Sequence, residues 1–552
     1  MKVPLLGQTG GEREEDVSYQ KTQNWYPHIS PDSKSKVVLY PTPGLTEFTS
    51  LGVEGAIRGS IVYGEEYYCV YYTGLYKITS SGSYVLLGTL DTAVGKVSMA
   101  HNGSNNGQQI IIADGTEGYI YDFEFSTFAK IELKSSGTAQ VDTNNKLDTT
   151  GVSGDFIANG VVAGMVVYNI TDGTQGIVGA VDSADVLSIV DSNGDALDLF
   201  PDGDEEYEVG DDAFPSTATH VAFMDGYFLA NDPTNSGRFQ ISAAYQGYDW
   251  NGLDFATAER SPDELQALVV SNRNLWLIGT RTTEIWYNSG AADFPFAPMQ
   301  SGFSQWGTVA PRSAIEISGT AFWLTQNDEG VGRVIHSDGI QPRIVDTPGI
   351  SAEISKLSTL TDAYAWAYQH QGHTMYVLTF PTDKRTFAYD ITTSMWHEWK
   401  TESTGYHRSN NHMYVYGKHL IGDPGNGKIY YLDWDNYTDN GESIVRLRRS
   451  WNIQAEDKAL RHYAIHLDIK EGVGNSDITD PSIHMRWRDN MGKWSNYYTR
   501  SMGQVGDQQK KVIWRRLGRS YERVYEFRVT DPCNAVLIDA YGIMQEDDRS
   551  IG

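Results

Sequence analysis

A strand–turn–strand pattern recurs seven times along this chain, and this repeat limits the possible folds more than any other feature. Each copy has a short apolar run, a polar turn and a second run that alternates around an aromatic residue. The apolar runs begin at residues 67, 109, 227, 275, 321, 375 and 419. Five of the six intervals are 42 to 54 residues long, close to the length of a β-propeller blade.

The repeat predicts an all-β protein with a six- or seven-bladed β-propeller, whose radial closure protects strand edges. Composition agrees, because 55 glycines suit tight turns and 34 tyrosines suit half-buried strands. Two β-sandwiches are the alternative, since they also produce short strands with regular turns. The period favours the propeller.

The one long interval, between the copies at 109 and 227, contains an acidic stretch at residues 135–214 with 16 acidic residues and one lysine, Lys146. Without this stretch the interval is 38 residues, which restores the period. Short β-type runs separated by glycine and aspartate occupy it, so we expect a small β-barrel inserted into a propeller loop.

These patterns divide the chain into five parts. We expect an extended N-terminal arm at 1–50, the propeller at 51–134 and 215–436, the acidic inserted β-domain at 135–214, and a C-terminal β-sandwich-like domain at 437–552.

Charge is unevenly distributed along the chain. The net charge is −28, yet residues 441–530 contain 17 lysines and arginines against 11 acidic residues. An acidic body opposes tight nucleic-acid binding, which needs bases to neutralise phosphates, but is compatible with a passage through which DNA slides. The basic C-terminal part makes the subunit dipolar, which suits head-to-tail association.

Six arginines of the C-terminal part are candidates for a subunit or partner interface, because guanidinium groups form bidentate contacts with acidic groups. They are Arg446, Arg448, Arg449, Arg515, Arg516 and Arg519. An ordinary solvated strand face is the alternative interpretation.

Catalytic and metal-binding motifs are weak. Residues 422–428 have the glycine and lysine spacing of a P-loop, but Ile429 replaces the magnesium-binding hydroxyl and a strand pattern follows, which predicts a turn between strands. The acidic loops at 191–195 and 433–439 predict solvated turns, with calcium binding as the alternative. Histidines 397, 407, 412 and 419 match no zinc motif; strand context should scatter them, so we expect surface or hydrogen-bonded residues.

We therefore expect no catalytic residue, no metal and no cofactor. Cys69 and Cys533 form no disulfide ladder, and the start of the chain turns polar at Gln8, far short of a signal peptide. No run of 18 apolar residues occurs, so we expect no membrane span and synthesis in a cytoplasm.

Several stretches in order carry a family resemblance. They are Asn24-Trp25-Tyr26-Pro27, Tyr40-Pro41-Thr42-Pro43-Gly44-Leu45, Lys96-Val97-Ser98-Met99-Ala100-His101, Gly279-Thr280-Arg281-Thr282-Thr283-Glu284-Ile285-Trp286 and Trp514-Arg515-Arg516-Leu517-Gly518-Arg519. In these stretches the chain resembles the packaged-DNA stabilisation proteins, or tail hub (nozzle) proteins, of short-tailed bacteriophages. Residues 135–214 have no counterpart in the resemblance.

The resemblance implies a structural, non-enzymatic virion protein of the phage tail, made in the host cytoplasm. It implies a homo-hexameric ring below the portal and its adaptor, or connector, that extends the DNA channel and retains packaged DNA. The ring would hold a tail needle or plug and carry tailspikes or fibres, and double-stranded DNA would pass through without tight binding.

Two other functions stay open. A propeller hydrolase acting on host cell-surface polysaccharide would need converging carboxylates, and none can be selected among 71 acidic residues. A carbohydrate-binding propeller could use the 34 tyrosines and 14 tryptophans as stacking platforms, although most lie in strand patterns that favour core packing.

Overall fold

The computed structural model describes residues 7–10, 20–29, 37–103, 108–152, 154–211, 213–327, 330–455, 458–507 and 510–547. Nearly all the regular structure is β. The exceptions within these ranges are a helical turn, η1 (Pro311–Ser313), and a short helix, α2 (Pro348–Ser355), which Thr347 caps by accepting a hydrogen bond from the Ile350 N–H.

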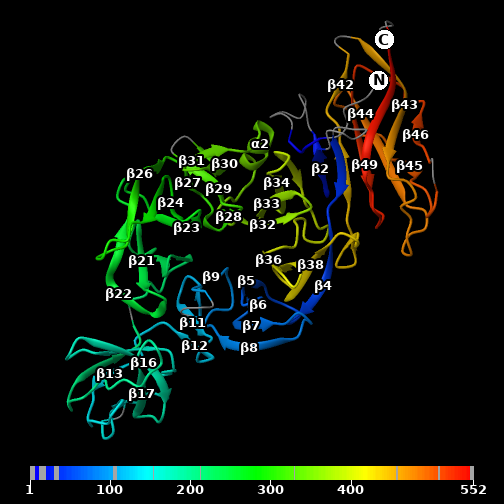
Figure 1. Ribbon diagram of the computed structural model, residues 1–552. Helices are drawn as coiled ribbons and strands as arrows, with labels where there is room; N and C mark the ends of the chain where they lie inside the picture. The colour runs from blue at the N-terminus through cyan, green and yellow to red at the C-terminus, as the bar shows by residue number, and fades with distance from the viewer. Residues whose placement is uncertain are drawn as a thin grey trace.

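The described residues form seven antiparallel sheets around a common axis, which are the blades of a β-propeller (Figure 1). Blades 1 to 4 are, from the inner strand outward, β5 (Ile57–Tyr63), β6 (Glu66–Tyr71), β7 (Gly74–Ile78), β8 (Tyr84–Thr89); β9 (Ser98–His101), β10 (Gln109–Ala113), β11 (Gly118–Asp122), β12 (Thr127–Lys130); β19 (Val221–Met224), β20 (Tyr227–Asn231), β21 (Arg238–Ala243), β22 (Gln246–Thr257); and β23 (Leu265–Ser271), β24 (Asn274–Gly279), β25 (Thr283–Asn288), β26 (Phe296–Ser304).

Blades 5 to 7 follow the same plan. Their strands are β27 (Gly307–Thr308), β28 (Ile315–Ile317), β29 (Thr320–Asn327), β30 (Gly330–Asp338), β31 (Gln341–Ile344); β32 (Tyr364–His370), β33 (His373–Phe380), β34 (Arg385–Asp390), β35 (Met395–Glu398); and β36 (Asn411–Val415), β37 (Lys418–Gly422), β38 (Lys428–Asp433). In blade 5, β27 and β28 both pair with β29.

The sequence repeat corresponds to the two middle strands of each blade. The apolar runs that begin at 67, 109 and 227 lie in β6, β10 and β20, the second strands of their blades. All ten residues of β10 and β11 are buried, because neighbouring blades cover both faces of the middle strands. The seven copies therefore mark seven blades.

A strand from the N-terminal part closes the ring. β4 (Gly44–Ser50) pairs antiparallel with β38 and takes the outer position of blade 7, with Leu45 opposite Leu432. β39 (Thr438–Asp439) and β40 (Glu442–Ser443) extend this sheet beyond β4. The two ends of the propeller sequence are thus joined through backbone hydrogen bonds of one sheet.

The acidic insert is one six-stranded sheet that projects from the propeller between blades 2 and 3 (Figure 1). Its strands, in sheet order, are β13 (Ser135–Thr138), β18 (Glu206–Val209), β15 (Val166–Asn169), β16 (Thr174–Val181), β17 (Val186–Val190) and β14 (Lys146–Asp148). A backbone hydrogen bond of 2.8 Å runs from Gln140 N, just after the edge strand β13, to Asp148 O in the other edge strand, β14. The sheet is therefore partly closed, in agreement with the predicted small β-barrel.

The C-terminal domain packs two sheets face to face. One contains β2 (Trp25–Ile29), β3 (Val37–Pro41), β49 (Leu537–Asp547), β43 (Ala459–Ile469), β46 (Val512–Arg515) and β47 (Arg519–Ser520). The other contains β1 (Lys21–Gln23), β41 (Arg446–Arg449), β42 (Ile453–Gln454), β48 (Glu522–Val529), β44 (Ser482–Asp489) and β45 (Tyr498–Ser501). Trp25, Trp514 and Phe527 pack in the core between them.

The second of these sheets is continuous with blade 6. β1 pairs in parallel with β35 at Gln23 and Glu398, and antiparallel with β41 at Gln23 and Leu447. The Asn24 N–H also donates to the Glu398 carbonyl at 2.8 Å. One hydrogen-bonded sheet therefore runs from the propeller into the sandwich.

The predicted fold class is confirmed: an all-β chain with a propeller, an inserted β-domain and a C-terminal sandwich. The segment predicted as an extended arm, 1–50, supplies β1 to β3 to the sandwich and β4 to blade 7, while residues 1–6, 11–19 and 30–36 lie outside the described part. No helix in the described ranges has the length and apolar character needed to cross a membrane.

Candidate functional site

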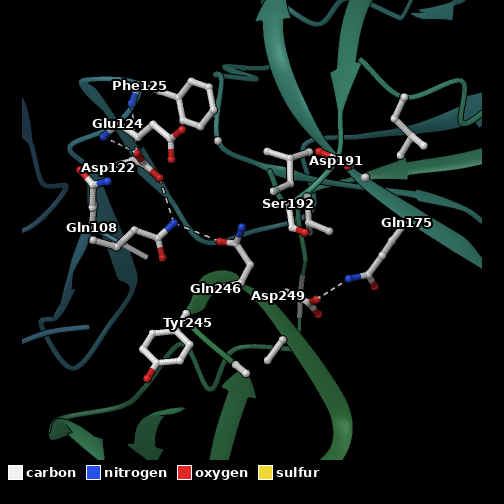
Figure 2. A pocket seen from close by; sticks show the side chains of 18 residues that line it. Gln108, Asp122, Glu124, Phe125, Gln175, Asp191, Ser192, Tyr245, Gln246 and Asp249 are labelled. Carbon is white, nitrogen blue, oxygen red and sulfur yellow. Dashed lines mark hydrogen bonds between the residues drawn. The ribbon is translucent and has the colours of Figure 1, made fainter. Parts of the chain in front are cut away.

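A pocket of about 670 Å³ lies where the acidic insert meets the propeller (Figure 2). It is bordered by the end of β11, by β16 of the insert and by the turn before β22. Four carboxylates are among its lining residues: Asp122, Glu124, Asp191 and Asp249. The described lining contains no lysine or arginine.

One carboxylate of this pocket, that of Asp249, joins the propeller to the insert. Asp249, on β22, accepts a hydrogen bond from the Tyr168 hydroxyl at 2.8 Å and from Gln175 Nε2 at 3.0 Å, both in the insert. Burial, reinforced by Asp249, raises the pKa of Tyr168 well above its ordinary value, so the phenol stays a hydrogen-bond donor. These contacts fix the insert against blade 3.

Asp122, at the end of β11, has a structural role within the propeller, where its network links blade 2 to blade 3. It accepts from Gln109 Nε2 at 2.9 Å and from the backbone N–H groups of Glu124 and Phe125, and Gln109 also donates to Gln246. Burial raises the pKa of Asp122. A hydrolase would need a carboxylate pair free to act on a substrate, whereas Asp122 and Asp249 are engaged in this network.

Two of the six candidate interface arginines are buried inside the subunit. Arg446 and Arg448, on β41, are both 0% exposed, so the prediction that they meet a partner at the surface is wrong for these two. Arg448 donates to Gln8 O, Thr22 Oγ1 and Gln20 Oε1 of the N-terminal segment. Burial lowers the pKa of Arg448 to about 9 and that of Arg446 to about 10.

Arg449 points to the opposite face of β41 and contributes to an internal ion-pair network. It donates to Glu526 Oε2 at 2.7 Å, and Arg486 donates to Glu526 Oε1 at 2.6 Å. The Trp494 ring lies 5.1 Å from the Arg449 guanidinium. The positive charge of Arg449 is therefore paired with Glu526 inside the sandwich, which weakens its attraction for a group on another molecule.

The other three candidates lie around the end of β46. Arg515 and Arg516 are exposed and Arg519 is half-buried. Arg516 has a φ of 62°, which places it in the tight connection from β46 to β47. These residues are accessible to another molecule, and their role as an interface stays a prediction.

The predicted scattering of the histidines is wrong. His397, His407, His412 and His419 gather between blades 6 and 7, where His412 Nε2 lies 3.0 Å from His419 Nδ1. His397 is 0% exposed, and neither of its ring nitrogens has a hydrogen-bond partner in the described part of the chain. Blades 6 and 7 stack face to face, so histidines from the two blades lie in the same interior layer between them.

The glycine-rich segment 422–428 is a turn between β37 and β38, as predicted. Asp423 Oδ1 accepts from the backbone N–H groups of Gly425 and Asn426. In the acidic insert, Asp191 Oδ1 accepts from the N–H groups of Asn193 and Asp195 in the same manner. The described residues contain no group of three or more potential metal ligands.

Two sequence-family models match nearly the whole chain. The model described as bacteriophage P22 Gp10, beta-propeller, matches residues 1–185 and 180–437, and the model described as bacteriophage P22 Gp10, beta-sandwich, matches residues 448–541. The chain belongs to the bacteriophage P22 Gp10 family. This confirms the family indicated by the resemblance in the sequence.

As a Gp10-family member, the chain is a structural phage protein of the tail and of packaged-DNA stabilisation. The first model's matched ranges cover the propeller together with the N-terminal strands and the insert, and the second falls in the sandwich. The expectation that residues 135–214 have no counterpart in the family is therefore wrong. A search of curated proteins found no match.

Solved structures similar to this Gp10-family chain share little sequence with it. They include the extracellular domain of a one-component system from B. thetaiotaomicron (7% identity, covering 93% of this chain and 80% of that one, TM-score 0.26) and apo AztD from Citrobacter koseri (11%, 70% and 94%, 0.28). The Pan2 WD40 domain of Neurospora crassa is a third (8%, 78% and 94%, 0.25). TM-scores this low carry no argument about function.

Proposed function

We propose that this chain is the subunit of a tail hub, or nozzle: a non-enzymatic homo-hexameric ring below the portal and its adaptor. The ring extends the DNA channel, retains packaged DNA, and anchors a tail needle or plug and tailspikes or fibres. Family membership supports a structural role in the tail. The finer assignment rests on the separation of charge within the subunit.

The acidic insert and the basic sandwich project from different parts of the propeller rim, with blades between them (Figure 1). The insert segment has 16 acidic residues and one lysine, whereas residues 441–530 have 17 basic and 11 acidic residues. Identical subunits with opposite charges on two separate faces favour head-to-tail contacts, which close into a ring when the rotation permits. The continuous sheet that joins blade 6 to the sandwich holds these two parts of the subunit together in such a ring.

The proposal predicts a template-dependent ring with a salt-dependent interface. The full-length chain should remain monomeric alone and form six-subunit rings when mixed with its purified connector, as seen by negative-stain imaging. The double variant Arg515→Glu, Arg516→Glu should lose assembly, because it reverses two exposed charges. A matched double variant, Arg273→Glu and Arg343→Glu, reverses two exposed charges on blades 4 and 5 and should still assemble.

Rings of another subunit number, or equal loss of assembly in both double variants, would contradict the proposal. Tight, salt-insensitive binding of free duplex DNA would also count against it, since an acidic channel should let phosphates slide. Release of reducing sugars from host capsule or cell wall would favour the hydrolase instead.

We also propose that the acidic insert is an outward docking site for tail fibres, because it projects from the propeller and is fixed there by Tyr168 and Gln175. Particles assembled with an insert-deleted chain should contain the ring but lack fibres when examined by electron microscopy. Normal fibre attachment in such particles would remove this assignment while leaving the hub assignment intact.

A further inference from the structure

The axis of the propeller contains a cavity of about 360 Å³. The inner strands of several blades line it, among them β5, β9, β28, β32 and β36, which surround the centre of the ring (Figure 1). At about 30 Å³ for each water molecule, this volume corresponds to roughly a dozen waters. The cavity is therefore large enough for a small hydrated ion.

Two cations, Lys96 and Arg312, come together where the inner strands begin. Lys96 immediately precedes blade 2 and Arg312 lies in η1, before β28. The Arg312 Nη2 group donates to the Lys96 carbonyl at 3.0 Å. Two residues 216 positions apart in the sequence thus place their positive groups beside the same cavity.

Within the described residues, neither cation has a carboxylate partner. Lys96 Nζ donates to the Asn410 carbonyl at 2.6 Å and lies 3.7 Å from the centre of the Tyr364 ring. Burial lowers the pKa of Lys96 well below its ordinary value, with a further contribution from Arg312, and burial lowers the pKa of Arg312 to about 10. Two desolvated like charges without a counter-charge are costly, and the cost falls when an anion joins them.

Arg58, in the same lining, shows how this fold satisfies a buried cation that has no ligand role. Its guanidinium donates to four backbone carbonyls and to Thr92 Oγ1. Among the described residues, the side chains of Lys96 and Arg312 form one hydrogen bond each, and both line the cavity, so their remaining N–H donors are available to a ligand there.

The other ionisable groups around the cavity leave this positive charge in place. His220 is buried beside Arg312, and burial lowers its pKa well below 6.5, so it is neutral at pH 7. Glu316 accepts the Gly319 N–H at 2.6 Å in the turn after β28. At the adjoining mouth, which Glu264 also lines, Asp232 is engaged by Arg238 at 3.5 Å. In the described part of the chain none of these carboxylates forms an ion pair with Lys96 or Arg312.

We propose that the axial cavity binds a small oxyanion, a phosphate or carboxylate group, between Lys96 and Arg312. Charge-assisted hydrogen bonds from an ammonium and a guanidinium are the strong donors for such groups. The inference is independent of ring assembly, because the site lies inside one subunit.

The test uses the purified full-length chain and inorganic phosphate, with sulfate and acetate as separate arms. Isothermal titration calorimetry and the thermal midpoint should both report saturable binding, beyond the effect of sodium chloride at matched ionic strength. The acetate arm distinguishes a carboxylate ligand from a tetrahedral oxyanion.

Arg312→Gln and Lys96→Gln should each weaken binding by at least about tenfold. Without added anion, their thermal midpoints should equal or exceed that of the parent chain, because each removes an uncompensated buried charge. Arg312→Lys, which keeps the charge, should retain binding. Arg343→Gln, on the outer strand β31 of the same blade as Arg312, is the matched control and should bind as the parent does.

Saturable binding in any arm that both Gln variants lose and the control keeps supports the site. The absence of saturable binding in all arms, or equal binding by the parent and both Gln variants, overturns it. If a Gln variant does not fold, Arg312→Lys decides the question. Saturable phosphate binding by this variant that chloride does not displace supports the site, and no saturable binding by it overturns the site.

Discussion

Glu526 is a fully buried carboxylate in the sandwich, and three side chains share it. Arg449 and Arg486 donate to its two oxygens, and the Tyr497 hydroxyl donates at 2.9 Å. These hydrogen bonds and charges hold the pKa of Glu526 below its ordinary value although burial opposes this. At the residue scale, stability here depends on the balance of a buried charge cluster, in which every member needs its partners.

Glu526→Ala should therefore destabilise the sandwich by about 2–4 kcal/mol, because it removes the buried carboxylate that two partly buried arginines and a tyrosine share. The matched change Glu546→Ala removes a carboxylate that pairs with Lys458 while both are about half exposed, and it should cost less than about 1 kcal/mol. Urea unfolding followed by tryptophan fluorescence measures both. Equal effects of the two substitutions would show that the buried cluster contributes no more to the free energy of unfolding than an exposed ion pair does.

Histidines buried without charge make stability depend on pH. Burial lowers the pKa of His397, His407 and His462 to about 3 and that of His419 to about 4. In the unfolded chain each takes up a proton near pH 6.5, and in the folded chain it does not. Their contribution to stability is complete above about pH 6.5 and is lost as pH falls toward 4.

Between pH 7.5 and pH 5.5 the free energy of unfolding should decrease, with a limiting slope of about 1.4 kcal/mol per pH unit for each such histidine. Burial raises the pKa of Asp439 to about 6 and also raises the pKa of Asp122, Asp211, Asp346 and Asp423. These carboxyl groups act in the opposite direction, so the net slope is smaller than the histidines alone would give. Thermal midpoints measured across this range check the prediction, and His407→Gln should flatten the slope. A midpoint that stays constant or rises on acidification would contradict it.

At the scale of elements, β4 is the strand that closes the propeller. It lies at residues 44–50 but completes a blade whose other strands lie at 411–433. Leu45 is 1% exposed and packs with Ile421 and Leu432. Gly44 crosses β39 so closely that a Cβ atom would lie 2.5 Å from the Asn436 and Thr438 carbonyl oxygens.

Leu45→Ala should lower the free energy of unfolding by about 2–5 kcal/mol, since it leaves a cavity at the closure of the ring. Glu47→Ala, on the same strand, removes an exposed side chain that pairs with Lys428 and should change stability by less than about 1 kcal/mol. Chemical denaturation of the two variants gives the comparison. Comparable losses would mean that β4 closes the ring through its backbone alone.

Element by element, the sequence predicted the blades better than their edges. The middle strands, such as β10 and β11, are apolar and adjacent in sequence, so their hairpins appear as a repeat. Outer strands have fewer buried residues, as in β8, where Tyr84, Val85 and Leu86 are exposed, and inner strands vary from β5, which is nearly all buried, to β9, which is mostly half-buried. Their pattern carries little signal, and β4 was missed as a blade strand for this reason.

At the scale of the whole molecule, the insert is attached at two adjacent points. β13 and β18 are neighbours, with Ser135 opposite Val209, so the chain leaves and re-enters the propeller at nearly the same place. Its core is continuous with that of blades 2 and 3, where Trp250 and Phe214 pack against each other. The chain could therefore bypass the insert without a long connection, but the insert packs against the propeller through a shared core.

Replacing residues 136–208 with a short glycine linker should leave a folded propeller and sandwich, because the two attachment points are strand neighbours. The thermal midpoint should fall, since Asp249 loses its two donors and apolar surface beside Trp250 becomes exposed. Circular dichroism and calorimetry report both properties. Loss of cooperative unfolding would show that the propeller requires the insert to fold.

Candidate site residues were less predictable than the fold. Arginines 446 and 448 look like a surface patch in the sequence, yet both are buried: the N-terminal segment covers Arg448, which bonds to Gln8 and Thr22, and Arg446 lies near Tyr437. Lys96 and Arg312 carry no local signal at all, because nothing in either neighbourhood indicates that the two meet at an axis. Contacts between distant segments decide which charges are buried and which are free.

The sequence alone determined the fold class, a propeller of six or seven blades, and the family, because blade hairpins are local and their burial on both faces imposes a repeated apolar pattern. The structure fixed the number of blades at seven. Only the tertiary structure decided how the ring closes, how blade 6 continues into the sandwich, and which cations and histidines share an interior. Pairings such as Leu45 with Leu432 or Gln23 with Glu398 join residues several hundred positions apart. A short strand can hydrogen-bond to any open edge, and only packing in three dimensions selects one.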